Sequence, residues 1–82
     1  MNIILVYNPK SGTALPIEEL RSKCEAHDIT INHAIDITDG FPDSLHPHLR
    51  ADALIAAIGG DGTLNSVAQE LYDTDAVFIP LP

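Results

Sequence analysis

The chain has 82 residues, of which 45% are hydrophobic and 20% are charged, and its formal net charge is −8. This length allows one domain at most, and this composition is globular, which excludes a disordered acidic tail. Twelve acidic side chains against four scattered basic ones argue against nucleic acid and anionic membrane as electrostatic partners.

The single cysteine, Cys24, allows neither a disulfide framework nor a zinc site with four cysteines, so we expect a reducing, cytoplasmic setting. Cys24 itself is expected to be a small apolar residue of a helix, because no base accompanies it.

The first half of the chain predicts two strands joined by a helix. Residues 3–7 are all apolar, which is typical of a strand buried between two layers. Residues 16–24 carry apolar side chains at helical spacing, a proline at the first position and two glutamates at the positive end of the helix dipole. Residues 29–37 alternate isoleucine with other residues, which predicts a strand with one drier face near a sheet edge. His33 belongs to that face and is expected to be a core or edge histidine.

The second half predicts two more strands and two helices. Residues 44–50 predict only a weak helix, because a proline interrupts them. Residues 53–58 form a second apolar run of strand length, and residues 64–72 place apolar side chains at the spacing of an amphipathic helix. Residues 76–79 begin a last apolar strand.

This alternation predicts an α/β fold, namely a Rossmann-like, three-layer α/β/α domain with a four-stranded parallel sheet in the order 2-1-3-4. The order leaves residues 76–79 at one edge of the sheet. Because a bare apolar edge strand invites pairing, we expect either that the chain is a fragment whose missing part covers this edge, or that two copies form a homodimer through it.

Two glycine-bearing loops are expected to converge at the carboxyl ends of the first and third strands, residues 8–13 and 59–63. Glycines let the backbone approach a ligand closely, and the helix that follows the second loop offers free N–H groups to a phosphate. Thr63 and Asn65 add side-chain donors. Asp61 would repel a bare phosphate, so a bridging Mg²⁺ or a polarised hydroxyl is expected beside it. Neither loop matches the Walker or the dinucleotide-binding fingerprint.

The two loops together carry a family resemblance. Asn8-Pro9-Lys10-Ser11-Gly12, followed later by Gly59-Gly60-Asp61-Gly62-Thr63-Leu64-Asn65, resembles the diacylglycerol kinase catalytic domain family, which includes bacterial lipid kinases and the sphingosine and ceramide kinases. A looser resemblance, through the second motif, reaches the NAD kinases and the 6-phosphofructokinases. The resemblance implies that both motifs, and Thr38 after the second strand, bind the phosphates and ribose of ATP.

The same resemblance implies an ATP-dependent lipid kinase that transfers the γ-phosphoryl group to the hydroxyl of diacylglycerol or a related lipid, with ATP and Mg²⁺ as cofactors. Residues 1–82 would be a partial nucleotide-binding domain, and the lipid acceptor would bind in an absent C-terminal β-sandwich domain. That absent part would hold the catalytic base and most Mg²⁺ ligands, and it would bring the protein to the inner face of the membrane. Asp61 is the one candidate catalytic residue in this chain, and we expect the 82 residues alone to catalyse nothing.

Two other interpretations stay open at this point. The chain would be a phosphotransferase of the NAD kinase type, or it would be a non-catalytic, truncated domain that folds and self-associates through its last strand. The pair His46 and His48 has a spacing that metals use, but without a Cys or carboxylate cluster beside it we interpret both as surface histidines.

Overall fold

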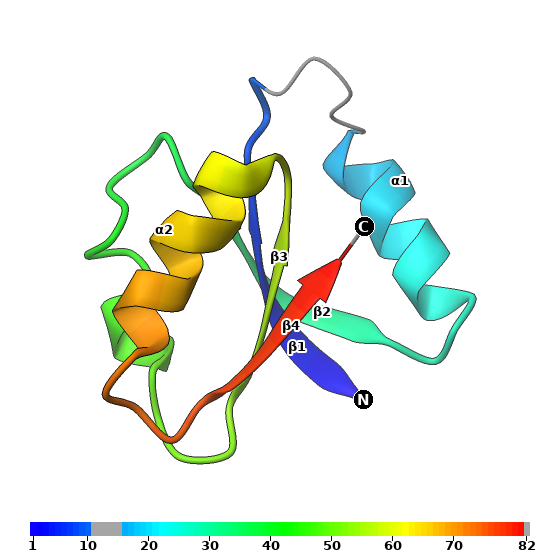
Figure 1. The fold of residues 1–82 in the computed structure, drawn as a ribbon. Helices are drawn as coiled ribbons and strands as arrows, with labels where there is room; N and C mark the ends of the chain where they lie inside the picture. Colours follow the sequence, from blue (N-terminus) through cyan, green and yellow to red (C-terminus); the bar gives the residue numbers. More distant parts are fainter. Residues whose placement is uncertain (11–15, 82) are drawn as a thin grey trace.

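Four strands form one parallel sheet in the order β2-β1-β3-β4 (Figure 1). The computed structural model describes residues 1–10 and 16–81. Its elements are, in chain order, β1 (Asn2–Tyr7), α1 (Ile17–Glu25), β2 (Thr30–Asp36), the 3-10 turn η1 (His46–His48), β3 (Leu54–Ile58), α2 (Asp61–Leu71) and β4 (Val77–Leu81). The predicted α/β class and sheet order are confirmed.

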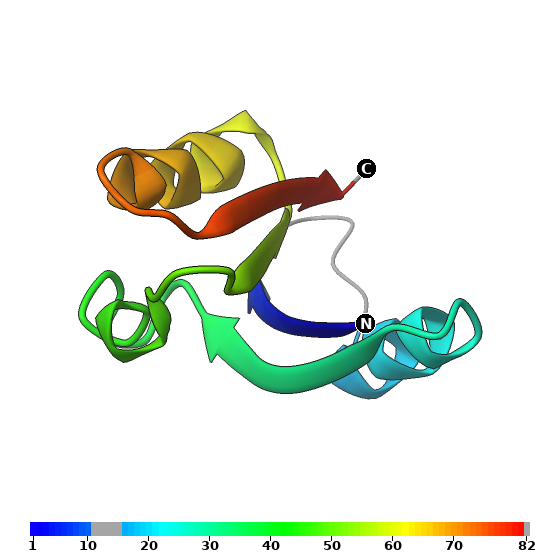
Figure 2. The same cartoon turned by 90° about the horizontal axis from the view of Figure 1, so that it is seen from below.

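The sheet is covered on both faces, which explains why its central strands are mostly apolar. Figure 2 shows α1 on one side of the sheet and α2 with η1 on the other. Successive side chains of β1 pack alternately into the two hydrophobic cores, because neighbouring side chains of a strand point to opposite faces of the sheet. The core under α1 contains Ile3, Leu5, Leu20, Ile31 and Ala56. The core under α2 and η1 contains Ile4, Val6, Ile35, Leu45, Ile55, Ala57, Val67 and Leu71.

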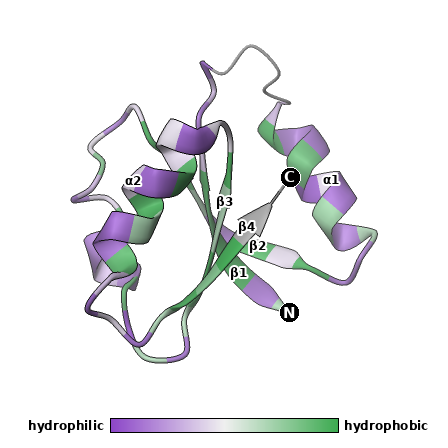
Figure 3. Ribbon diagram, in the orientation of Figure 1, coloured by the Kyte–Doolittle hydropathy of each residue, from purple (hydrophilic) through white to green (hydrophobic). Residues whose placement is uncertain are grey.

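The two helices bury one stripe each, as their sequence patterns predict. In Figure 3 both carry hydrophobic and hydrophilic residues in alternating bands, whereas the central strands are mostly hydrophobic. Leu20 is the buried residue of α1, and half-buried Cys24 packs on the same core cluster. Arg21 ties α1 to the neighbouring strand, because its guanidinium donates to the carbonyl oxygen of Ile31 at 2.7 Å.

The second strand departs from the predicted alternation. Ile3 pairs with Ile31 but Ile4 pairs with His33, so Asn32 is an extra residue that forms a β-bulge. A slip of one residue exchanges the two faces of a strand. Ile31 therefore packs in the core under α1, whereas Ile35 packs under α2. The prediction of one drier face shared by the isoleucines and His33 is wrong for this reason, and His33 is exposed on the edge strand.

Two boundaries also differ from the prediction. The weak helix expected over residues 44–50 is only the short η1, because the backbone is already extended at its C-cap, Leu49, with φ −84° and ψ 93°. The last strand continues through Pro80 to Leu81 instead of ending at Ile79. Proline is tolerated there because β4 lies at a sheet edge, where a missing ladder donor costs little.

The strand β4 pairs with β3 at the edge of the sheet, and Val77 is 46% exposed. Association of two copies through this edge stays a prediction. Within residues 1–10 and 16–81, neither helix has the length and apolar character needed to cross a lipid bilayer.

A histidine pair lies between β2 and η1, and the surroundings of one member, His48, predict that the stability of the fold depends on pH. The rings of His33 and His48 have centroids 4.5 Å apart. Burial, followed by the nearby charges of His33 and Arg50, lowers the pKa of His48. The folded chain thus disfavours protonated His48, so its stability is complete above the ordinary histidine pKa of about 6.5 and falls as pH drops below that value.

We therefore expect the urea midpoint of unfolding to fall between pH 7 and pH 5 less steeply in His48→Gln than in the unsubstituted chain. His27→Gln is the matched control, because His27 is exposed in the turn after α1, and it should keep the original slope. Equal slopes for His48→Gln and the unsubstituted chain would show that His48 does not contribute to the acid sensitivity.

Candidate functional site

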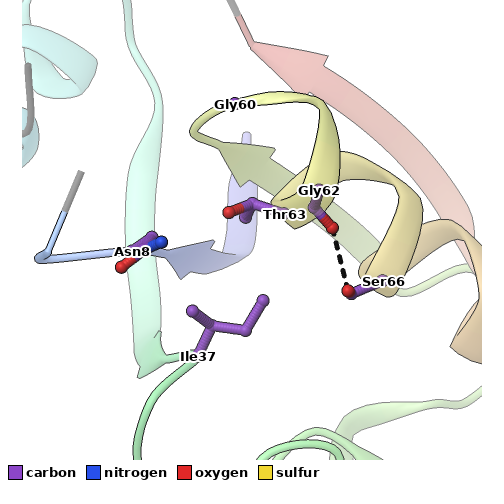
Figure 4. Close-up of a pocket in the computed structure, with 6 residues that line it drawn as sticks. All are labelled: Asn8, Ile37, Gly60, Gly62, Thr63 and Ser66. Carbon is purple, nitrogen blue, oxygen red and sulfur yellow. Dashed lines mark hydrogen bonds between the residues drawn. The ribbon is translucent and has the colours of Figure 1, made fainter. Parts of the chain in front are cut away.

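A cleft of about 490 Å³ lies at the carboxyl ends of the central strands, where α2 begins (Figure 4). It is lined by Asn8, Ile37, Gly60, Gly62, Thr63 and Ser66. These residues follow three different strands, β1, β2 and β3. The structure thus brings parts of both predicted glycine-bearing loops together at the predicted switch point, and it adds the residue that follows β2.

The loop after β1 is organised by Asn8. Its side-chain oxygen accepts a hydrogen bond from the amide of Lys10 at 3.0 Å, which makes a local turn at Pro9. Pro9 and Lys10 are exposed. The predicted ligand residues Ser11 and Gly12 lie outside the described part of the chain.

Gly59 is required by the turn between β3 and α2. Its φ is +152°, and a Cβ added there would lie 2.9 Å from both Cβ and Oγ1 of Thr63. A larger residue would meet a side chain that is itself 6% exposed and held in the first turn of α2. Gly59 therefore serves the close approach of strand and helix.

Gly60 and Gly62 have a different environment, although they belong to the same motif. Apart from the chain neighbours of each glycine and the backbone of α2 itself, no described atom lies within 4 Å of a Cβ added at either position. Neither position has a positive φ, so a side chain there would meet no backbone strain. Both residues line the cleft. Their missing side chains leave open space beside the backbone, which is the geometry that a closely approaching ligand needs.

The helix α2 begins at Asp61, three residues before the predicted start at Leu64. Apolar periodicity finds only the amphipathic part of a helix, so a first turn made of Asp61, Gly62 and Thr63 gives no such signal. Gly60 is the N-cap residue, and its carbonyl accepts from the amides of Thr63 and Leu64 at 3.0 and 3.2 Å. No side chain of the described residues caps this end. The amides of Asp61 and Gly62, which have no hydrogen-bond acceptor among the described residues, and the positive end of the helix dipole are therefore available to an anion.

The predicted side chains of this motif have unequal positions. Thr63 is buried and lies across the cleft from Asn8 (Figure 4). Leu64 packs against the core under α2, so it would meet a ligand only through its backbone. Asp61 and Asn65 are exposed and do not line the cleft.

Two cleft residues were missed by the sequence reasoning. Ser66 donates from Oγ to the carbonyl oxygen of Gly62 at 2.8 Å (Figure 4). Its position one helical turn after Gly62 and Thr63 would have revealed it, had the helix been started at Asp61. Ile37 faces Ser66 and Gly62 from the other wall of the cleft. Ile37 could have been predicted from its position directly after a parallel strand, because ligands bind at the carboxyl ends of such strands.

Thr38 follows the cleft-lining residue Ile37 in the chain, is exposed, and is not itself part of the cleft lining. Its hydroxyl and its amide both donate to Oδ1 of Asp36, at 2.6 and 2.8 Å. These two hydrogen bonds from Thr38, with a further contribution from the charge of Lys10, hold the pKa of Asp36 below its ordinary value. Asp36 is thus an ionised acceptor at neutral pH.

The histidines at positions 46 and 48 have separate surroundings. His46 pairs through Nε2 with Glu70 at 2.7 Å, whereas the ring of His48 lies against that of His33 at a tilt of 39°. Over residues 1–10 and 16–81, no group of three or more His, Cys, Asp or Glu side chains is arranged to hold a metal ion.

The arrangement of the cleft suits a ligand with an anionic end and a less polar end. Helix amides, two glycines without steric neighbours and the hydroxyl-bearing residues Thr63 and Ser66 line one wall. Ile37 provides apolar surface on the other wall. These groups are suited to bind and orient a ligand, and none of the described side chains that line the cleft is ionisable.

Comparison with known proteins gives one family. The family model described as "Diacylglycerol kinase catalytic domain" matches residues 2–81, which include every strand and helix of the fold. Searches of curated proteins and of solved structures gave no match.

Proposed function

This chain belongs to the diacylglycerol kinase catalytic domain family, and from that premise we propose that it is the ATP-binding part of a lipid kinase. Membership implies kinase-type phosphotransfer and the use of ATP at the level of the family. The resemblance expected from the two loop motifs is confirmed at that level. The acceptor, a hydroxyl of diacylglycerol or a related lipid, is part of the proposal, as is its binding by a domain beyond these residues.

The open first turn of α2 is the observation that carries this proposal. Gly60 and Gly62 have no steric neighbours among the described residues, and they lie where the helix presents unpaired amides. Phosphate groups bind at such positions because the amide dipoles favour negative charge. We place the ATP phosphates here, with Thr63 as a side-chain donor. Asn8, Pro9 and Lys10, followed by Ser11 and Gly12, would close the phosphate site from the opposite loop.

The proposed reaction moves one phosphoryl group. The lipid hydroxyl oxygen forms a bond to the γ-phosphorus, the bond from that phosphorus to the β,γ-bridging oxygen breaks, and ADP leaves. The hydroxyl proton passes to a general base, a role that we assign to no residue of this chain. The residues of this chain contribute positioning and charge stabilisation, which account for most of the catalysis in phosphoryl transfer.

Asp61 is the residue that we propose to act with Mg²⁺. It is exposed in the first turn of α2, beside the proposed phosphate site. One carboxylate fits this ion, since Mg²⁺ is usually held by one or two carboxylates, water and the substrate phosphates. When bound, Mg²⁺ neutralises phosphate charge. Without it, the Asp61 carboxylate opposes the binding of ATP through charge repulsion.

We expect titration with Mg-ATP to shift the amide NMR signals of the two loops, residues 8–12 and 59–65. Asp61→Ala should remove the Mg²⁺ dependence of these shifts and weaken Mg-ATP binding by roughly tenfold, the effect of one lost charge-assisted contact. Asp73→Ala is the matched control, because Asp73 is an exposed carboxylate just after α2. It should behave like the unsubstituted chain. Absence of ATP-dependent shifts in the folded, unsubstituted chain would contradict the proposed function.

A further inference from the structure

A second, smaller cavity lies at the other end of the sheet from the cleft. Its volume is about 120 Å³, against about 490 Å³ for the cleft. Its apolar lining consists of Ile3 and Ile4 of β1 with Ala53 and Leu54 at the start of β3. These residues lie at the amino ends of the two central strands, whereas the cleft lies at the carboxyl ends. The two sites share no lining residue.

The polar lining of this small cavity is rich in hydrogen-bond donors. It consists of Asn2, Asn32, His48, Arg50 and Asp52. The two side-chain amides, the imidazole and the guanidinium all carry N–H groups, and the Asp52 carboxylate is the one group that only accepts. The lining is therefore suited to an anion that offers several acceptor oxygens.

Two irregular backbone segments bring these polar groups to one place. The bulge in β2 leaves Asn32 without a partner on β1, and the ring of the next residue, His33, lies with its centroid 4.5 Å from that of His48. The amide of Ala53 donates to the carbonyl oxygen of Arg50 at 3.1 Å, which closes a turn before β3. Segments that are distant in the sequence thus contribute side chains to one cavity.

The guanidinium of Arg50 is available to a ligand in this cavity. It takes part in neither of the ion pairs found within residues 1–10 and 16–81, which both belong to His46. The other arginine, Arg21, already donates to a main-chain carbonyl oxygen of β2. A guanidinium presents a planar set of N–H donors that matches the oxygens of a phosphate group.

We propose that this cavity is a second anion site, which takes a phosphate group at the amino ends of the strands. Arg50 is its principal cation, and the amides of Asn2 and Asn32 supply further donors. Because drug-sized ligands need cavities of about 300 Å³ or more, the ligand is inorganic phosphate or a phosphate group whose remainder lies outside the cavity. The inference goes beyond the proposed function and does not depend on it, since no residue of the cleft takes part.

The protonation of His48 is expected to be coupled to this anion. In the ligand-free chain, burial and the positive charges of His33 and Arg50 lower the pKa of His48. A bound anion opposes that charge effect and favours the protonated ring. Of the other charged groups around η1, Asp52 shares the cavity lining and Glu70 of α2 is engaged in an ion pair. Anion binding should therefore take up a proton and become tighter as the pH falls.

The experiment titrates the folded chain with inorganic phosphate and follows the NMR signals of the backbone amides and of the Arg50 and His48 side chains. We expect saturable shifts at residues 2–4, 32–33 and 48–54. Arg50→Gln should weaken binding by about tenfold or more, the effect of losing a charge-assisted contact. Lys23→Gln is the matched control, because it removes the same charge from an exposed position on α1. It should bind phosphate almost as the unsubstituted chain does.

Removal of the opposing carboxylate should have the opposite sign. Asp52→Asn should strengthen phosphate binding by about 3- to 10-fold, because one negative charge leaves the lining. Asparagine tolerates the φ of +67° at this position. Asp28→Asn is the matched control, because Asp28 is also exposed, has a φ of +61° and does not line the cavity. It should leave the affinity nearly unchanged.

Sulfate tests the coupling to His48 without a change in the charge of the ligand, since sulfate stays a dianion between pH 8 and pH 5. The Kd for sulfate should fall over this range in the unsubstituted chain and fall less in His48→Gln. His27→Gln should keep the original dependence, because His27 is exposed in the turn after α1. Equal pH dependence in both variants would contradict the coupling.

Vesicles distinguish a free phosphate from a lipid headgroup. The net charge of −8 opposes binding to an anionic surface, so vesicles of phosphatidylcholine with phosphatidic acid should retain no more chain than vesicles of phosphatidylcholine alone. Retention that Arg50→Gln abolishes would assign the phosphate to a lipid. Absence of phosphate-dependent shifts in the cavity lining, or equal affinity in Arg50→Gln and Lys23→Gln, would overturn the inference and leave the proposed function untouched.

Discussion

We expect Gly59→Ala to lower the free energy of unfolding by about 2–4 kcal/mol, through backbone strain combined with an overpacked contact. The φ of +152° is a conformation that side-chain-bearing residues rarely adopt, and the new Cβ would lie 2.9 Å from Cβ and Oγ1 of Thr63. Thr63 has little room to move, because it is buried in the first turn of α2. Urea unfolding followed by circular dichroism measures the loss.

The control for this substitution is Gly60→Ala. Gly60 has an ordinary φ of −76° and, its chain neighbours apart, no described atom within 4 Å of an added Cβ. The free energy of unfolding of Gly60→Ala should therefore change by less than about 1 kcal/mol. A Gly59→Ala chain as stable as Gly60→Ala would contradict the close approach of β3 and α2 at this turn.

The second large effect is expected from Gly62→Ala, and it concerns binding instead of stability. We expect the affinity for Mg-ATP to fall by about 10- to 100-fold, because the added methyl group occupies the open space where phosphate oxygens would meet the amides of α2, and two to three hydrogen bonds would be lost. The free energy of unfolding should stay constant or rise, since alanine is a better helix former than glycine and meets no described atom. Calorimetry and urea unfolding of one preparation separate these two quantities.

Gln69→Ala provides the comparison on the same helix, at an exposed position that does not line the cleft. It should leave both affinity and stability close to those of the unsubstituted chain. Unchanged binding in Gly62→Ala would show that the phosphates do not lie on the first turn of α2, and the proposed site would have to be moved.

These two glycines show how far a motif can be interpreted from sequence. The run from Gly59 to Thr63 predicts a tight, glycine-dependent connection at the end of a buried strand, and the family match supports its assignment. The amino-acid sequence alone does not distinguish a glycine that the turn requires from a glycine that ligand binding requires. Only the position of Thr63 over Gly59, and the open space beside Gly60 and Gly62, make that distinction.

The cleft itself was only half predictable. The motifs indicated the loops after β1 and β3, because their composition is unusual. Ile37 and Ser66 have no unusual composition, and they belong to the cleft only because the end of β2 and the second turn of α2 come to the same edge of the sheet. Proximity between residues that are distant in the sequence is a property of the folded chain.

The sequence by itself determined the elements, the α/β class and the order of the sheet, because local hydrophobic periodicity and the rules for parallel crossovers depend on short segments. The tertiary structure decided the faces of β2, where the bulge at Asn32 sends Ile31 and Ile35 to opposite layers. It also brought His33 against His48 and placed Ile37 in the lining of the cleft. Strand register and side-chain contacts are set by pairing between strands that are distant in the sequence. The hydrophobic period of one strand therefore does not indicate a register shift such as the bulge in β2.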